Sequence, residues 1–158
     1  PRYQDRVLLL SSGPYSAVPA SEVGRGEEEW LRDSLRIRLD HECFHYLTSR
    51  VFGLIRSNVL DELLADFAGL VGAYGEYRAE LGLRFLGVER DGILRPRARL
   101  RVYRGALSDA ALAVVARLAL RVAATLEMRA EGEVVGAAIP RAQQLVACAG
   151  LGLAGLAG

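Results

Sequence analysis

The feature that most constrains this chain is a pair of histidines four positions apart, the only two histidines among its 158 residues. His41 and His45 begin and end the run His41-Glu42-Cys43-Phe44-His45, which has the pattern HExxH. On an α-helix, residues four apart lie on one face, one turn from each other, so both imidazoles are directed to the same place. The motif therefore predicts a helix here that carries two metal ligands, with Glu42 beside them.

Length and composition favour one globular domain over residues 1–158. With 51% hydrophobic residues the chain is long enough to bury a core without disulfide or metal staples. The formal net charge is only +1, which gives no general attraction to nucleic acid or to anionic lipid. We therefore expect no nucleic-acid partner.

Periodicity and capping residues predict a mainly α fold. One helix begins at the acidic run Glu27-Glu28-Glu29 and carries the motif, and a second begins at the cap Ser57-Asn58 and continues to about Ala73. A third runs from Ser108 to about Glu131, and Pro140 can start a last one. The apolar residues of the first helix are expected to share one surface: Trp30, Leu31, Leu35, Leu39, Phe44 and Leu47.

Two short segments predict at most a small β element. Arg6 to Ser12 is an apolar run that ends at Ser-Ser-Gly-Pro, and Arg97 to Val102 alternates with period two. In the second segment the arginines are expected on the solvated face of an edge strand. A basic patch that holds an acidic ligand is the alternative.

The two cysteines and the C-terminal segment bear on compartment and partners. Cys43 and Cys148 are too few for a disulfide scaffold, and Cys43, about 200° around the helix from either histidine, is expected to face the core. No signal peptide is visible, so a cytoplasmic location is expected. Residues 145–158 carry no charge but fall short of the roughly twenty residues of a membrane span. They predict a buried terminal helix, or a tail that packs on a partner such as a second copy of the chain.

Two histidines do not complete a catalytic zinc site, which usually takes three protein ligands and a water. A third histidine in the metzincin pattern is excluded, since Thr48 and Val51 stand where that pattern needs Gly and His. Glu62 and Asp66 lie one turn apart on the next predicted helix. Glu62 can serve as the third ligand while Asp66 accepts the second N–H of a ligating imidazole.

Over residues 40–69, the HExxH motif followed by E-x-x-x-D resembles the gluzincin zinc metallopeptidases, the thermolysin-like group. The resemblance implies zinc held by His41, His45 and Glu62, with Glu42 as general base and Asp66 as the partner of a ligating histidine. The substrate would be a peptide or protein, bound in a small cleft as in the minimal single-domain relatives. Because no further histidine exists, an arginine or one of four tyrosines would have to stabilise the tetrahedral intermediate: Tyr46, Tyr74, Tyr77 or Tyr103.

Two other classes of protein fit the same residues. The first is a zinc-stabilised helical domain without catalytic turnover that binds a protein partner through its apolar C-terminal segment. The second is a metal-free helical domain in which Glu42 and Asp66 only satisfy the hydrogen bonds of buried histidines.

Overall fold

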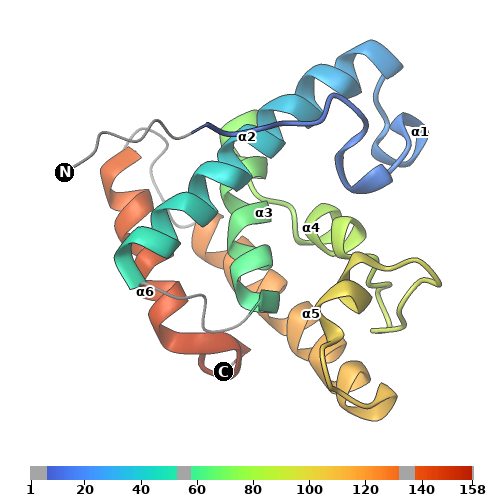
Figure 1. The fold of residues 1–158 in the computed structure, drawn as a ribbon, viewed down its shortest axis with the longest axis vertical. Helices are drawn as coiled ribbons and strands as arrows, with labels where there is room; N and C mark the ends of the chain where they lie inside the picture. The colour runs from blue at the N-terminus through green and yellow to red at the C-terminus, as the bar shows by residue number, and fades with distance from the viewer. Residues whose placement is uncertain (1–6, 53–57, 132–137, 158) are drawn as a thin grey trace.

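The computed structural model describes residues 7–52, 58–131 and 138–157, and this part of the chain is mainly α-helical (Figure 1). The predicted fold class is therefore confirmed. In the described residues the β structure is limited to an isolated bridge between Val88 and Leu94. The elements in chain order are η1 (Tyr15–Ala17), α1 (Ala20–Val23), α2 (Glu27–Phe52), α3 (Asn58–Tyr74), α4 (Ala79–Leu86), η2 (Arg99–Arg104), α5 (Asp109–Glu131) and α6 (Ala138–Ala157).

Helix α3 is the centre of the molecule. It contacts α2, α4, α5, α6 and η2, and in Figure 1 its ribbon lies among them. Its composition explains this position, because apolar side chains occur on nearly every side of it, and Leu63, Leu64 and Ala65 are fully buried in succession. Two carboxylates, Asp61 and Asp66, are buried on this same helix and need partners from its neighbours.

Helices α2 and α3 pack antiparallel. Near one end of the pair the Tyr74 hydroxyl donates a hydrogen bond to Asp33, and near the other end His45 bonds Asp61. Close approach is possible because α3 has glycine where it meets α2. A Cβ atom on Gly69 would lie 2.6 Å from the backbone oxygen of Ile37. The short distance between the helix axes at this point brings opposing polar side chains within hydrogen-bonding range.

The face that α2 turns toward the core differs from the predicted one. Trp30 and Phe44 are buried as expected, but four leucines of the predicted apolar surface are exposed: Leu31, Leu35, Leu39 and Leu47. The buried face instead includes three polar residues spaced seven apart, Ser34, His41 and Thr48. This orientation is favoured because His41 and Thr48 meet the buried carboxylates of Asp66 and Asp61 on α3. Ser34 accepts a hydrogen bond from the Tyr15 N–H.

Both predicted β segments are wrong. Residues 7–12 form no strand, and Arg6 lies outside the described residues. The second segment enters η2, a 3₁₀-helix anchored by the fully buried Leu100. A period-two pattern makes a strand only where a neighbouring strand offers hydrogen bonds, and the described residues provide none there.

The third and the last helix predicted from the sequence are both present, as α5 and α6. The Ser108 hydroxyl accepts a hydrogen bond from the Ala111 N–H at 3.2 Å, which caps α5. Helix α6 packs on α5 and α3 and buries Cys148 and Leu156. Across the described residues, no helix combines the length and apolar character that a membrane crossing requires.

We predict that Gly69→Ala destabilises the protein by about 1–3 kcal/mol, because the new methyl group must push α2 away from α3. Gly150→Ala is the matched control: it also lies in a helix, and its Cβ would meet nothing within 4 Å. This control should stabilise the protein by roughly 0.5–1 kcal/mol, since alanine loses less backbone entropy than glycine on folding. Urea unfolding of the three proteins measures both effects. A Gly69→Ala variant as stable as the parent would show that the contact between α2 and α3 is not tight.

Candidate metal centre

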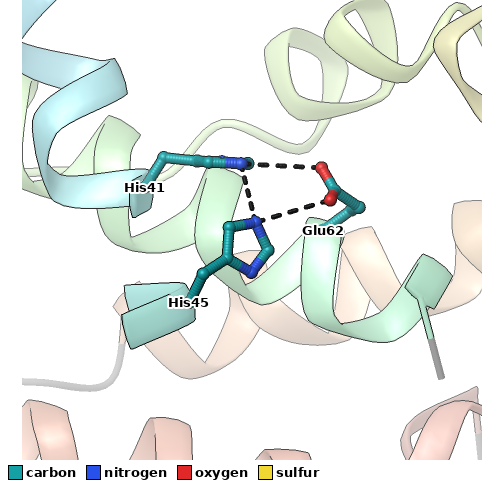
Figure 2. Close-up of side chains that lie close together, drawn as sticks. All are labelled: His41, His45 and Glu62. Atoms are coloured by element: carbon teal, nitrogen blue, oxygen red, sulfur yellow. Dashed lines mark hydrogen bonds and ion pairs between the residues drawn. The ribbon is translucent and has the colours of Figure 1, made fainter. Parts of the chain in front are cut away.

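Three side chains from two helices converge at one point between α2 and α3. His41 and His45 come from α2 and Glu62 from α3, and Figure 2 shows both imidazoles directed at the carboxylate. Each offers one ligand atom, and these atoms all lie within 4.8 Å of one another. The structure thus brings together the three residues that the sequence selected as ligands.

Two of the three distances between the candidate ligand atoms suit a tetrahedral metal ion. Ligands about 2.1 Å from a tetrahedral zinc lie about 3.4 Å from each other. The His41 Nε2–Glu62 Oε2 distance is 3.5 Å and the His45 Nε2–Glu62 Oε1 distance is 3.4 Å. The two Nε2 atoms are 2.9 Å apart, a hydrogen-bonding distance for imidazoles that share a proton without metal. The donor set, two nitrogens and one carboxylate, is one that zinc prefers.

His41 is held by a network on the side away from the metal position. Its Nδ1 lies 3.0 Å from Asp66 Oδ1 and 2.7 Å from the Tyr15 hydroxyl, which itself donates to the same Asp66 oxygen at 2.6 Å. This pattern is satisfied when Nδ1 carries the proton. The lone pair is then on Nε2 and points toward Glu62, as metal binding requires.

Asp66 is fully buried and is kept ionised by its neighbours. Burial alone would raise its pKa, but the charge of the Arg99 guanidinium, with the bonds from His41 and Tyr15, lowers the pKa below the usual range of aspartate. Burial and the nearby Asp66 charge raise the pKa of Tyr15, so its hydroxyl keeps the proton that it donates.

His45 has a carboxylate partner that the sequence reasoning missed. Its Nδ1 lies 2.5 Å from Asp61 Oδ2, and the Thr48 hydroxyl donates to the other oxygen of Asp61 at 3.1 Å. Burial alone would lower the pKa of His45, but hydrogen bonds to Asp61 and Glu62 outweigh it and raise this pKa to about 10. The sequence assigns Asp61 no role at this site. The sequence feature that could have identified Asp61 is that it is a third carboxylate in an otherwise apolar helix.

Arg99 and Tyr15 were also missed. Arg99 bonds Asp66 Oδ2 through one terminal nitrogen, and the same nitrogen lies 3.7 Å from Glu62 Oε2. The other terminal nitrogen donates to the Ser16 hydroxyl at 2.8 Å. The prediction of a solvated arginine is wrong for Arg99. The alternative was a basic patch that holds an acidic ligand. Arg99 does contact acidic groups, but they are the Asp66 and Glu62 carboxylates of this chain.

The backbone that carries Tyr15 is strained. Ser16 and Ala17 follow it with φ of 51° and 57°, in the left-handed region that residues with a Cβ rarely adopt. Such conformations persist where the surrounding contacts determine them, and they concentrate at functional sites. The contacts here are those that bring the Tyr15 hydroxyl between His41 and Asp66.

The remaining candidate residues have different environments. Glu42 is half-buried and forms no hydrogen bond or ion pair with the described residues. Cys43 is exposed, so its predicted core position is wrong: the helix buries the histidine face instead. Among the four tyrosines left open by the sequence, Tyr103 lies where the charge of Glu62 acts on it, whereas the Tyr74 hydroxyl donates a hydrogen bond to Asp33. Burial and the Glu62 charge raise the pKa of Tyr103, which keeps it a hydrogen-bond donor.

Comparison with known proteins gives a family but no activity. Neither the curated proteins nor the solved structures include a match to this chain. One family model, described as a family of unknown function (DUF7005), matches residues 1–157. Because the match covers nearly the whole chain, the protein belongs to this DUF7005 family.

Proposed function

We propose that this protein binds one zinc ion through His41, His45 and Glu62 and is a zinc-dependent hydrolase of peptide bonds. One observation carries the proposal. Both imidazoles present Nε2 to the same point as the Glu62 carboxylate, while each Nδ1 lies against a carboxylate of its own, Asp66 or Asp61. Carboxylate partners of this kind orient histidine ligands and increase their basicity.

The charges around the site also favour a divalent cation. Asp61, Glu62 and Asp66 contribute three formal negative charges, and Arg99 contributes one positive charge against them. With both histidines neutral, as metal binding requires, the difference is two negative charges in a largely buried position, where unbalanced charge is costly. A bound dication would balance them, and the neutral tautomer of each histidine would then be the stable one.

Hydrolysis would use residues that lie around this centre. When bound, zinc supplies an acidified water molecule and polarises the carbonyl oxygen of the substrate. Glu42, next to a ligand in sequence and without a hydrogen-bond or ion-pair partner among the described residues, would take the proton from that water. Tyr103, a protonated donor on the Glu62 side, would stabilise charge on the substrate oxygen. These roles extend the resemblance to gluzincins, and the geometry of His41, His45 and Glu62 supports the metal site on which the roles depend.

A second candidate is a zinc-stabilised helical domain that binds a protein partner without turnover. The absence of any strand from the described residues favours it, since an extended peptide then has no sheet edge to align on. Leu31, Leu35 and Leu39, exposed on successive turns of α2, offer an apolar stripe that such a partner would cover.

We predict that purified protein binds one equivalent of zinc and that His45→Ala loses it. Zinc at about 100 times its dissociation constant should stabilise the native protein by about 2.7 kcal/mol, because only the folded chain brings the ligands together. Metal analysis and thermal unfolding with and without a chelator measure the two effects. Glu42→Gln is the control and should retain zinc. Equal melting temperatures with zinc and with chelator would count against a metal centre.

We predict that Glu42→Gln lowers peptide hydrolysis by about 10² to 10⁴ without loss of zinc, because the amide cannot accept the proton of the attacking water. Turnover of a peptide library by the wild-type and variant proteins, normalised to metal content, measures this. If the zinc-loaded wild-type protein cleaves no peptide, the interaction-domain candidate replaces the enzyme.

We predict that zinc affinity rises with pH. Because the metal-free His45 has a pKa of about 10, zinc must displace its proton at neutral pH. Each displaced proton gives roughly a tenfold gain in affinity per pH unit. Chelator competition at a series of pH values measures the slope. Asp61→Asn removes a hydrogen bond that raises the His45 pKa and should make the slope shallower. A flat profile for the wild-type protein would show that His45 is not a ligand.

A further inference from the structure

We propose that the protein forms a symmetric dimer in which the exposed face of α2 packs antiparallel on the same face of a second copy. The dimer does not depend on the proposed metal site, because the candidate ligands lie on the side of α2 that faces α3. It names one partner, a second copy of this chain, for the leucines that α2 exposes.

Helix α2 has one face that the described residues leave uncovered over its whole length. Among the described elements, α3 and η1 make the main contacts with α2. On the other side, exposed residues follow one another at intervals of 4, 3, 4, 4, 3 and 4, a spacing that keeps them on one helix face. They form the outer face of α2: Glu28, Arg32, Leu35, Leu39, Cys43, Tyr46 and Arg50.

The middle of this outer face is apolar. Leu35 and Leu39 are 46% and 39% exposed, and Tyr46 is 45% exposed. A surface helix normally turns its leucines inward and its polar groups outward, whereas α2 buries Ser34 and His41. A row of apolar side chains on the solvent side of a helix is typical of a surface that another protein covers.

The ends of the outer face are complementary to each other in charge. Glu28 lies 11 residues before Leu39, and Arg50 lies 11 residues after it. In an antiparallel pair with its two-fold axis at Leu39, Glu28 of one copy therefore faces Arg50 of the other, and the contact occurs twice. Neither side chain forms an ion pair with the described residues, although Glu29 and Asp40 of the same helix do.

The inner positions match in the same arrangement. Arg32 and Tyr46 each lie 7 residues from Leu39, so a guanidinium meets an aromatic ring. Leu35 and Cys43 each lie 4 residues from Leu39 and form an apolar pair. Leu39 meets Leu39 of the second copy at the axis. A parallel pair would instead bring Arg32 against Arg32, and contacts between like charges are unfavourable.

The length of α2 is sufficient for a stable interface. Its 26 residues make a helix about 39 Å long. Two helices of this length, packed along their exposed faces, bury an area on the order of the 800 Å² per partner of a standard interface. Interfaces of standard size have dissociation constants of about 1 μM or lower, so we expect a dimer in that range.

The experiment is sedimentation equilibrium of the purified protein over a series of concentrations. The wild-type protein should be a dimer. Leu39→Arg should raise the dissociation constant at least about 100-fold, because two guanidinium groups would meet at the two-fold axis. Val114→Arg is the matched control: Val114 is an apolar residue of α5 that is 47% exposed and lies outside the outer face, and this variant should match the wild type.

A charge reversal tests the antiparallel arrangement itself. Glu28→Arg and Arg50→Glu should each raise the dissociation constant about 10-fold, since two contacts between like charges replace two ion pairs. The double variant restores both ion pairs with their signs exchanged, and it should return to within about threefold of the wild type. This recovery is expected only where Glu28 of one copy faces Arg50 of the other.

Circular dichroism checks that each variant folds, and if Leu39→Arg does not fold, the charge-reversal series still decides. A wild-type protein that is monomeric across the series would overturn the inference. So would a dimer that Leu39→Arg leaves intact, or one that Val114→Arg weakens as much. A double variant that stays as weak as the single ones would overturn the antiparallel arrangement about Leu39.

Discussion

A carboxylate that has no contact with water stands at the centre of this protein. Asp66 is 0% exposed, on the helix that all the larger helices surround or approach. An isolated charge in such a place would cost several kcal/mol, so the rest of the fold must supply partners. Three segments do so: α2 with His41, η1 with Tyr15 and η2 with Arg99. The strained backbone after Tyr15 and the inward turn of η2 both follow from this requirement.

The same requirement sets the orientation of the longest helix. An amphipathic helix normally buries its leucines, yet α2 leaves Leu35 and Leu39 exposed at 46% and 39% and buries His41 and Ser34. Burying polar groups is favourable only where each finds a partner: α3 offers Asp66 to His41 and Asp61 to Thr48, and the Tyr15 N–H bonds Ser34. Gly69 permits the approach at which the hydrogen bonds become short. The helix pair is therefore specified by its polar contacts as much as by its apolar ones.

A network of this kind is a weak source of stability by itself, because the cost of dehydrating the charges offsets most of their attraction. The network does, however, fix the positions of the side chains that it joins. Each imidazole is fixed by a carboxylate at its Nδ1, and the Glu62 carboxylate lies beside the Arg99 guanidinium. Prearranged ligands of this kind lower the reorganisation needed for a metal to bind. The polar interior therefore fixes the positions of these side chains more than it stabilises the fold.

The sequence alone determined what depends on local spacing. The four-residue interval between His41 and His45, and the same interval between Glu62 and Asp66, predicted which side chains share a helix face, because helical geometry is fixed over one turn. Acidic starts and caps likewise predicted helices that begin at Glu27 and Asp109.

Tertiary structure alone decided which face of each helix turns inward, and which distant residues complete the site. Tyr15 and Arg99 lie 51 and 33 residues from Asp66 in sequence, and no periodicity links them to it. The period-two arginines predicted a strand because the pattern is local, whereas a strand requires a partner that this fold does not offer them within the described residues. A buried charge is stable only where a cation of the chain lies beside it. Which cation lies there depends on how the helices pack.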